Sequence, residues 1–334
     1  MTALFSNQVA RTAGLLVGLV ILTCCFFSSI VFGVLDTSWQ TVIDAYTQFN
    51  GTNEHIVIKE VRVPRALIAA AVGASLGIAG ALLQALTRNP MGDVELFGLN
   101  GGAALAIVIG VSFFSMNSLT QFAWLAFAGA AISGIAVYLI GGGGKGDVTP
   151  VKLTLAGAAI TALAGALVYG LLTLNEEELQ EVLFWLAGSV AGRELSFLTA
   201  VLPYLIVGWL GSILIAAQVQ TLLMGDDVAK GLGQRTVLIK IAAGAVIVLL
   251  CGSAVAVAGP IGFVGLITPH LARYLVGLHM RWIFAYSAVM GAILLLAADI
   301  GARFLAFPGE VPIGVVTAFL GAPFFLYVAR KGLS

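Results

Sequence analysis

Long apolar runs and short polar connections alternate along almost the whole chain. A helix that crosses a membrane needs about 20 consecutive apolar residues, because lipid offers no partners for backbone polar groups. The pattern therefore predicts an all-α polytopic membrane protein with about ten transmembrane helices, organised as a single transmembrane domain over residues 1–334. The expected spans are 13–35, 65–86, 95–114, 119–140, 151–173, 195–216, 237–258, 262–278, 283–305 and 311–329.

The composition supports this assignment and excludes several classes of protein. A soluble domain carries about 25% charged residues, whereas this chain carries 10% and is 60% hydrophobic. Soluble enzymes and disordered proteins do not have this composition. The 16 basic and 16 acidic residues balance, and the sequence contains no polybasic tract. A nucleic-acid partner is therefore not expected.

The distribution of basic residues predicts the orientation in the membrane. If both termini lie on one side, only Lys59, Arg62, Arg65, Arg193 and Arg303 of the 16 basic residues fall on the other side. Loops rich in Lys and Arg stay in the cytoplasm. Both termini are therefore expected in the cytoplasm, with the chain crossing the plasma membrane several times.

The span 65–86 and its surroundings carry features of a closely packed helix. Gly73 and Gly77 form a small-residue face on which another helix can pack, and Asn89-Pro90 is expected to end the span at the inner surface. Further along, Pro260 and Pro269 are expected to break a helix near both ends of the passage between them. A broken helix at membrane depth is tolerated where it is buried in protein or lines a cavity.

Two outer segments are longer than the other connections on that side. The segment 36–64 is polar and runs into Arg62-Val63-Pro64-Arg65. The segment 174–192 predicts a short amphipathic surface helix, because its apolar residues repeat at helical spacing. Asp299 and Arg303 are four residues apart near another outer end, a spacing that allows a local ion pair.

The cytoplasmic connection 217–236 is the candidate for contact with a partner. Gly225 separates two short helical pieces, Asp226 is expected to cap the second, and Gly231 and Gly233 to end it. The pattern is compatible with a plain solvated loop and equally with a loop that docks into a cleft on a partner. The apolar residues that favour docking are Leu222, Leu223, Met224, Val228 and Leu232.

A set of short motifs in fixed order resembles the permease subunits of ABC importers for iron-siderophores, haem and cobalamin, the FecCD-type permeases. The resemblance covers roughly residues 55–330. It is carried by Arg62-x-Pro64-Arg65, Gly80-x-x-x-Gln84, Arg88-Asn89-Pro90, Trp185-x-x-Gly188-Ser189, Gly225-x-x-x-Ala229-x-x-Leu232-Gly233, the run Gly259 to Leu266, Pro269-His270-x-x-Arg273, Asp299-x-x-x-Arg303 and Glu310-x-Pro312-x-Gly314-x-x-Thr317-Ala318.

The resemblance implies a transport subunit that works in an assembly. It implies a second permease subunit, identical or related, with the pathway between the two. Two cytoplasmic ATP-binding subunits and an extracellular or periplasmic substrate-binding protein complete the importer. The implied cargo is a ferric siderophore or a similar iron complex, with haem or cobalamin as the alternative.

The resemblance also assigns roles to residues. The implied ATPase-coupling loop comprises Met224, Gly225, Asp226, Asp227, Val228, Ala229, Lys230, Gly231, Leu232 and Gly233. The implied docking residues for the binding protein are Arg62, Arg65 and Arg303. The alternative for Arg303 is that it only pairs with Asp299.

No enzymatic activity is expected of the chain itself. The run Gly141 to Lys145 lacks the spacing and the Ser or Thr of a Walker A loop, so ATP hydrolysis is expected in partner subunits. No catalytic residue, metal ligand or cofactor is assigned, and His270 is expected to pack between helices rather than to bind iron.

A different class of transporter stays open at this stage. An ion-coupled secondary transporter also combines about ten spans with broken helices. Such a protein usually carries ionisable residues near mid-membrane, whereas Asp299 is expected near an outer end. Transport without an ATPase would favour this alternative.

Overall fold

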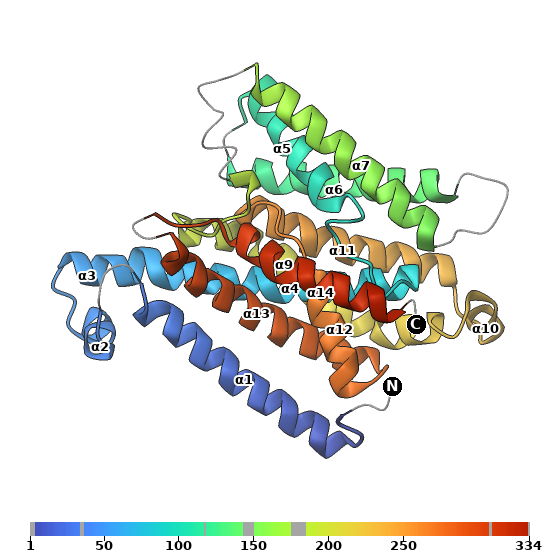
Figure 1. The fold of residues 1–334 in the computed structure, drawn as a ribbon, viewed down its shortest axis with the longest axis horizontal. Coiled ribbons are helices and arrows are strands. Elements are labelled where there is room, and N and C mark those ends of the chain that lie inside the picture. The colour runs from blue at the N-terminus through green and yellow to red at the C-terminus, as the bar shows by residue number, and fades with distance from the viewer. Residues whose placement is uncertain are drawn as a thin grey trace.

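The computed structural model describes residues 4–33, 37–116, 118–142, 150–174, 185–306 and 309–332. Within these ranges every regular element is a helix, as the apolar pattern predicts (Figure 1). The helices are α1 (Gln8–Val31), α2 (Trp39–Thr47), α3 (Asn53–Ile56), the π-helix η1 (Val57–Arg62), α4 (Val63–Thr87), α5 (Leu99–Phe114), α6 (Leu119–Gly142), α7 (Pro150–Leu172), α9 (Leu195–Leu222), α10 (Asp226–Gly231), α11 (Thr236–Ala258), α12 (Val264–Val276), α13 (Met280–Leu305) and α14 (Ile313–Gly332).

Eight of the described helices are long and apolar enough to cross a membrane. They are α1, α4 with the turns before it, α6, α7, α9, α11, α13 and α14. Each of the two remaining expected spans also contains a helix, but α5 has 16 residues and α12 has 13. The expected surface helix 174–192 lies largely outside the described residues, as does the glycine run after α6.

Helix α4 lies at the centre of the bundle, in contact with α13, α11, α12 and α9 (Figure 1). Its packing against α13 depends on glycine, as the small-residue face predicts. A Cβ atom on Gly73 would overlap the Gly291 carbonyl, and one on Gly77 would overlap the Ser287 carbonyl. The two backbones therefore touch directly, which is a common way for membrane helices to associate.

The chain between α11 and α12 is unwound, which confirms one of the two proline breaks. Helix α11 ends before Gly259, and α12 begins after Phe263, whose φ of 68° lies in the left-handed region. The second expected break is wrong, because Pro269 lies inside α12. A proline leaves the carbonyl four residues earlier without its helical donor. Here Gln84 Nε2 donates to that carbonyl, Gly265 O, at 3.0 Å.

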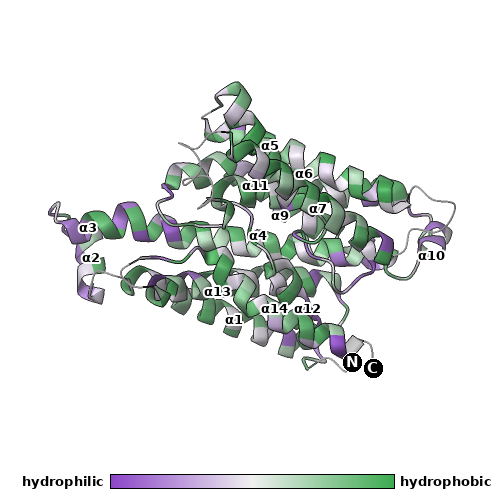
Figure 2. Cartoon of the chain, turned by 45° about the horizontal axis from the view of Figure 1, so that its top comes forward, coloured by the Kyte–Doolittle hydropathy of each residue, from purple (hydrophilic) through white to green (hydrophobic). Residues whose placement is uncertain are grey.

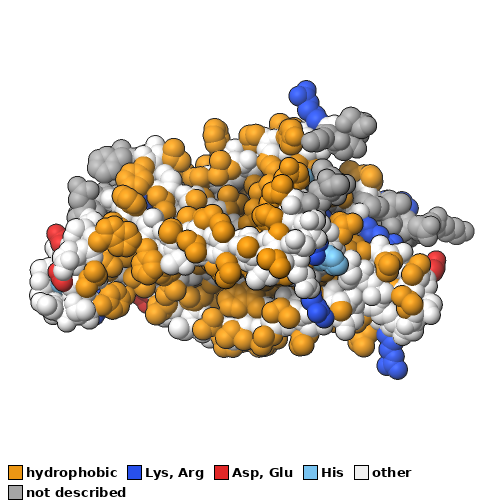
Figure 3. Space-filling model, turned by 90° about the horizontal axis from the view of Figure 1, so that it is seen from below, with side chains coloured by type: hydrophobic (Ala, Val, Ile, Leu, Met, Phe, Trp, Pro, Cys, Tyr) orange, Lys and Arg blue, Asp and Glu red, His pale blue; other side chains and the backbone are white. Residues whose placement is uncertain are grey.

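Polar and apolar residues are separated along the length of the bundle. Hydrophobic residues cover the helices, while hydrophilic residues gather around α2 and α3 at one end and α10 at the other (Figure 2). The space-filling view shows apolar side chains along the middle of the molecule and Lys and Arg side chains mainly toward the α10 end (Figure 3). Helix α1 begins and α14 ends at the α10 end (Figure 1).

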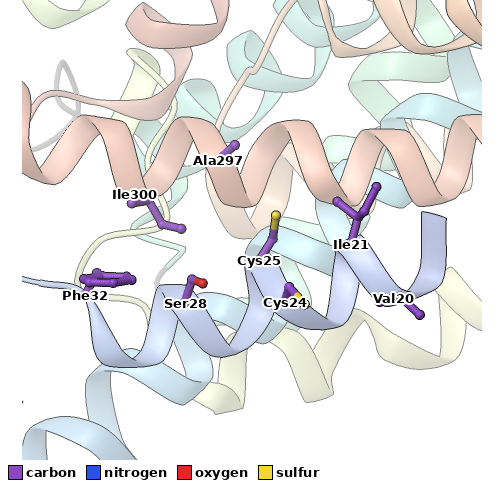
Figure 4. A pocket seen from close by; sticks show the side chains of 8 residues that line it. All are labelled: Val20, Ile21, Cys24, Cys25, Ser28, Phe32, Ala297 and Ile300. Atoms are coloured by element: carbon purple, nitrogen blue, oxygen red, sulfur yellow. The ribbon is translucent and has the colours of Figure 1, made fainter. Parts of the chain in front are cut away.

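A shallow apolar groove of about 450 Å³ lies between α1 and α13 (Figure 4). Its lining is Val20, Ile21, Cys24, Cys25, Ser28, Phe32, Ala297 and Ile300. Neighbouring α1 side chains such as Leu16 and Val17 are exposed. The groove therefore opens onto the apolar outer surface of the bundle and offers no polar passage.

Candidate functional sites: the coupling loop and the outer arginines

The loop after α9 forms one short helix, α10, at the basic end of the bundle. Helix α10 begins at Asp226, and Gly225 occupies the capping position with a φ of 118°. The expectation that Asp226 caps the helix is therefore wrong by one residue. Gly225 takes that position because its backbone reaches a conformation that disfavours other residues, and its carbonyl accepts from Ala229 N at 2.9 Å. Gly233, with a φ of 80°, forms the turn after the helix.

Part of the loop projects apolar side chains away from the bundle. Met224 and Leu232 are each 69% exposed, and Val228 is exposed as well. Leu222, in contrast, is buried at the end of α9, and Ala229 is the buried residue of α10. A loop that had only to be solvated would not expose three large apolar side chains together. The structure thus presents the apolar surface that the docking interpretation requires.

Asp226 joins the loop to two long helices through ion pairs. Arg88, the residue that follows α4, donates to Asp226 Oδ1 at 2.6 Å. Lys240 of α11 pairs with Asp226 Oδ2. These contacts lower the pKa of the Asp226 carboxyl, chiefly through the hydrogen bond from Lys240. Arg88 Nη2 also donates to Leu222 O at 3.0 Å, so the same guanidinium holds the end of α9.

At the opposite end, Arg62 and Arg303 hold the C-terminal end of α1. Arg62 Nη1 donates to Ile30 O at 2.9 Å and to Val31 O at 2.7 Å. Arg303 Nη1 donates to Ser29 O at 2.7 Å and to Phe32 O at 2.8 Å. The last carbonyls of a helix lack intrahelical partners and carry partial negative charge, so a cation is favourable there. The two arginines supply that cation from outside the helix.

Arg65 and Arg303 share one buried carboxylate. Arg65 Nε donates to Asp299 Oδ1 at 2.8 Å, and Arg303 pairs with Asp299 Oδ2, as the spacing of four residues predicts. Arg65 Nη1 also donates to Glu310 Oε2 at 2.8 Å. The side chain of Glu310 is 30% exposed, so this last pair is the one nearest to solvent.

The structure therefore joins two of the three predicted docking arginines, Arg65 and Arg303, with Asp299 and Glu310 in an outer charge network. Arg62 lies beside this network and shares the end of α1 with Arg303. Arg62 is 4% exposed, Arg65 6% and Arg303 2% in the free chain. Each is engaged by groups of the chain itself. Contact with a binding protein stays a prediction for all three.

Sequence reasoning did not single out a small cleft at the outer end. The cleft has a volume of about 390 Å³ and lies between η1 and the start of α9, lined by Glu60, Val61, Gly192, Arg193, Glu194, Leu195 and Ser196. The guanidinium of Arg193 lies over the ring of Phe197 at 5.2 Å. In the described part of the chain no carboxylate pairs with Arg193, and burial lowers its pKa. A charge count along the chain identified Arg193 as an outer cation, but its place over the Phe197 ring and in the cleft depends on the fold.

Sequence reasoning also missed a buried polar cluster beside the helix break. Asp93 Oδ2 accepts from Phe263 N at 3.0 Å, so a carboxylate faces the N-terminal end of α12. Glu95 Oε2 accepts from Asn100 Nδ2 at 2.9 Å, and Asn100 Oδ1 accepts from the Cys251 thiol. A half-helix terminus is where a transporter commonly holds an anionic substrate. In this structure a side chain of the protein itself occupies that place.

His270 lies on α12 beside α14. Its ring packs edge-to-face on Phe324 with centroids 5.5 Å apart. This contact fits the expected packing role. No group of three or more metal-ligating side chains is found among the residues that the structure describes.

Comparison with known proteins identifies the family. The model of the FecCD transport family matches residues 20–331. The chain belongs to this family. The match covers both sites described above and confirms the resemblance that the motifs indicate.

Several relatives align over most of the chain. "Probable siderophore transport system permease protein YfiZ" of Bacillus subtilis (strain 168) is 50% identical over 320 residues, which cover 94% of this chain and 96% of the relative. "Fe(3+)-citrate import system permease protein YfmD" of the same organism is 43% identical and covers 85% and 84%. "Ferric enterobactin transport system permease protein FepD" of Escherichia coli (strain K12) is 37% identical and covers 97% and 96%.

A solved structure has the same fold. It is a metal-chelate type ABC transporter in an inward-facing conformation, with a TM-score of 0.80 and 28% identity. The match covers 96% of this chain and 99% of that chain. The bundle in Figure 1 is therefore the permease fold of this family.

Proposed function

We propose that this chain is the membrane-spanning subunit of an ATP-driven importer, and that the importer carries a ferric siderophore or a similar iron complex into the cell. The observation that supports this most directly is the α10 loop, because it projects Met224, Val228 and Leu232 beyond the bundle at the basic end. The relatives named above transport iron complexes according to their names. In this proposal the chain itself hydrolyses no ATP.

The proposed topology has ten spans with both termini in the cytoplasm. Helices α5 and α12 supply the two spans that are shorter than the rest. The α10 end carries Arg88, Lys230, Arg235 and Lys240, and positive charge near span ends favours the cytoplasmic side. The end of the bundle that bears α10 is therefore assigned to the cytoplasmic face of the plasma membrane. The end that bears α2 is assigned to the outer face.

The proposed assembly contains a second permease subunit, two ATP-binding subunits and a substrate-binding protein. The coupling loop, defined as residues 224–233, contacts the ATP-binding subunits. An apolar loop held by ion pairs at its base suits this task, because its exposed groups bind the partner while its anchored groups transmit movement.

Three single substitutions to alanine test the loop assignment. Gly225 and Gly233 have positive φ, whereas Gly231 is helical and has open space around it. A side chain at a positive φ costs about 1–2 kcal/mol, so Gly225→Ala and Gly233→Ala are expected to weaken association with the ATPase subunits about 5- to 30-fold. Gly231→Ala is the matched control: it adds the same methyl group to the loop without backbone strain and should weaken association less than either of the other two. Co-purification from membranes, at equal amounts of inserted chain, measures the effect. Equal association of all three variants would contradict the assignment.

We further propose that the binding protein docks at the outer charge network. A carboxylate of the partner could exchange with Glu310, the most exposed member, and pair with Arg65. Exposed charge pairs of this kind mainly set orientation and association rate. The outer cleft with Arg193 lies on the same end and offers a second cation to the partner.

Reversing buried arginines risks unfolding, so the docking proposal is best tested by changing Glu310. Glu310→Gln removes the internal competitor for Arg65 and should increase the affinity for the binding protein at low salt, with a smaller gain at high salt. Arg193→Gln should reduce that affinity. The affinity of each variant for the binding protein, measured in nanodiscs at two salt concentrations, tests the docking proposal. If neither variant changes the affinity at low salt, the outer network has only a structural role.

A further inference from the structure

We propose that Asp226 is a positioning residue that passes movement of the coupling loop to α4 and α11. The proposal rests on the function proposed above, in which the loop contacts ATP-binding subunits. It adds the route by which the loop acts on the transmembrane helices, and it assigns that route to one carboxylate and its two cations.

The contacts of Asp226 are arranged to join separate elements. Its Oδ1 accepts from Arg88 at 2.6 Å, and its Oδ2 pairs with Lys240 of α11. Arg88 also donates to Leu222 O at the end of α9. One carboxylate in the first turn of α10 therefore connects the ends of α4, α9 and α11. A displacement of α10 must either carry these ends with it or break the pairs.

Helix α4 is suited to carry such a displacement across the molecule. It has 25 residues, which corresponds to a length of about 37 Å. Direct backbone contact with α13 at Gly73 and Gly77 leaves it little freedom to bend locally. Its inner end is followed by Arg88, and its outer end carries Arg65, which belongs to the outer charge network. The same helix thus connects the coupling loop with the end where the binding protein is proposed to dock.

The exposure of the Asp226 side chain and its two partners favours a mechanical role over a stabilising one. The side chains of Arg88, Asp226 and Lys240 are between one third and one half exposed. Exposed ion pairs contribute little to the stability of a fold. Their loss should leave the chain folded and inserted, so that an effect on coupling can be measured.

The adjacent residue provides a matched control. Asp227 carries the same charge on the same short helix and is exposed. Among the described residues it forms no ion pair. Asp227→Asn therefore removes the same charge from the loop without touching the contacts to α4 and α11.

The test uses the whole importer in proteoliposomes with Asp226→Asn, Asp226→Glu and Asp227→Asn. Three quantities are measured: association with the ATPase subunits, ATP hydrolysis stimulated by the binding protein, and uptake of a radiolabelled ferric complex. The complex is the one that the wild type carries among hydroxamate, catecholate and citrate complexes. Asp226→Asn should keep its association but lose coupling, with uptake per ATP reduced by up to about 30-fold, the most that two exposed ion pairs can account for. Asp226→Glu should retain most of the coupling. Asp227 lies on the surface proposed to contact the ATPase subunits, so Asp227→Asn is compared only in uptake per ATP, and that ratio should stay near the wild-type value.

A second pair of variants shows whether the cation and the carboxylate act as a unit. Arg88→Gln should reduce coupling as Asp226→Asn does, and the effect of the double variant should be smaller than the product of the two single effects, since both remove the contact that Arg88 and Asp226 share. Multiplying effects would overturn the proposal.

Two further outcomes would also overturn it. One is normal uptake per ATP in Asp226→Asn, and the other is loss of ATPase association in that variant, which would make Asp226 part of the docking surface. Failure of the wild-type chain to associate with the ATPase subunits is a different result, because it would overturn the proposed function itself.

Discussion

At the residue scale, Asp299 is the most deeply buried charged residue of the outer charge network. Its side chain is fully buried and is shared by Arg65 and Arg303. Removing the Asp299 carboxylate leaves the buried Arg303 without an acidic partner among the residues that the structure describes, and leaves Arg65 with Glu310 alone. Removing Glu310 has less consequence, because that side chain reaches solvent.

Asp299→Asn is therefore expected to destabilise the chain by about 3–5 kcal/mol, the usual cost of breaking a buried ion pair. Glu310→Gln is expected to cost less than Asp299→Asn, because Glu310 is 30% exposed and Arg65 keeps its pair with Asp299. Thermal unfolding of the purified chain in detergent measures both variants. Similar midpoints for the two variants would contradict the inference that Asp299 is the structural centre of the network.

The coupling loop should show a pH dependence that belongs to Asp226. The pKa of this carboxyl lies below its ordinary value of 3.8. A group with a lowered pKa stabilises the folded state above its ordinary pKa and loses that contribution as the pH falls through the folded-state value. The anchoring of α10 is therefore present at neutral pH and is lost in acid.

Hydrogen exchange of the α10 amides can detect this loss. Compared at the same pH, Asp226→Asn should exchange faster than the wild type at neutral pH, and the difference should vanish as the pH falls through the folded-state pKa, which lies below 3.8. A difference that persists unchanged in acid would show that Asp226 does not hold α10 through its charge.

At the scale of elements, the contact between α4 and α13 depends on the absence of side chains. Gly77 faces the Ser287 carbonyl, whereas Gly244 of α11 has nothing within 4 Å of the Cβ position. The two glycines are both helical and differ mainly in their surroundings. They therefore form a matched pair for testing the packing.

Gly77→Ala should destabilise the chain by about 1–3 kcal/mol, because overpacking forces the helices apart. Gly244→Ala should be neutral or stabilising, by up to about 1 kcal/mol, because alanine favours the helix. Thermal midpoints in detergent distinguish the variants. Equal midpoints would show that the α4–α13 contact can relax without cost.

The elements were largely predictable from the sequence, since helices in a membrane are specified by local apolar runs. All ten expected spans contain a helix, and the small-residue face and the break at Pro260 were correct. The break at Pro269 was wrong because the carbonyl it leaves unpaired is satisfied by Gln84, more than 180 residues away in sequence. A local pattern cannot reveal such a partner.

The sites were predictable only as far as their residues act locally. The pair Asp299–Arg303 and the exposed apolar groups of the coupling loop follow from spacing and composition. The burial of Arg62 against the end of α1 and the contact of Asp93 with Phe263 do not, because both depend on how distant segments pack. The pairing of Asp226 with Arg88, the residue that follows α4, could not be predicted for the same reason.

At the scale of the whole molecule, the bundle has a polar site at each end and an apolar exterior between them (Figure 3). Helix α4 carries an ion-paired arginine at both ends, so the two sites are joined by one rigid element. Asp93 fills the half-helix terminus where a transporter often holds its substrate. This architecture suits a subunit whose movement is driven by partners.

The most direct test of the account is uptake by the reconstituted importer. Proteoliposomes containing this chain, its ATPase subunits and its binding protein are supplied with a radiolabelled ferric siderophore, with and without internal ATP, and with ionophores that collapse ion gradients. The account predicts uptake that requires ATP and the ATPase subunits and is unaffected by the ionophores. Uptake by this chain without ATPase subunits, abolished by the ionophores, would show an ion-coupled transporter and contradict the account.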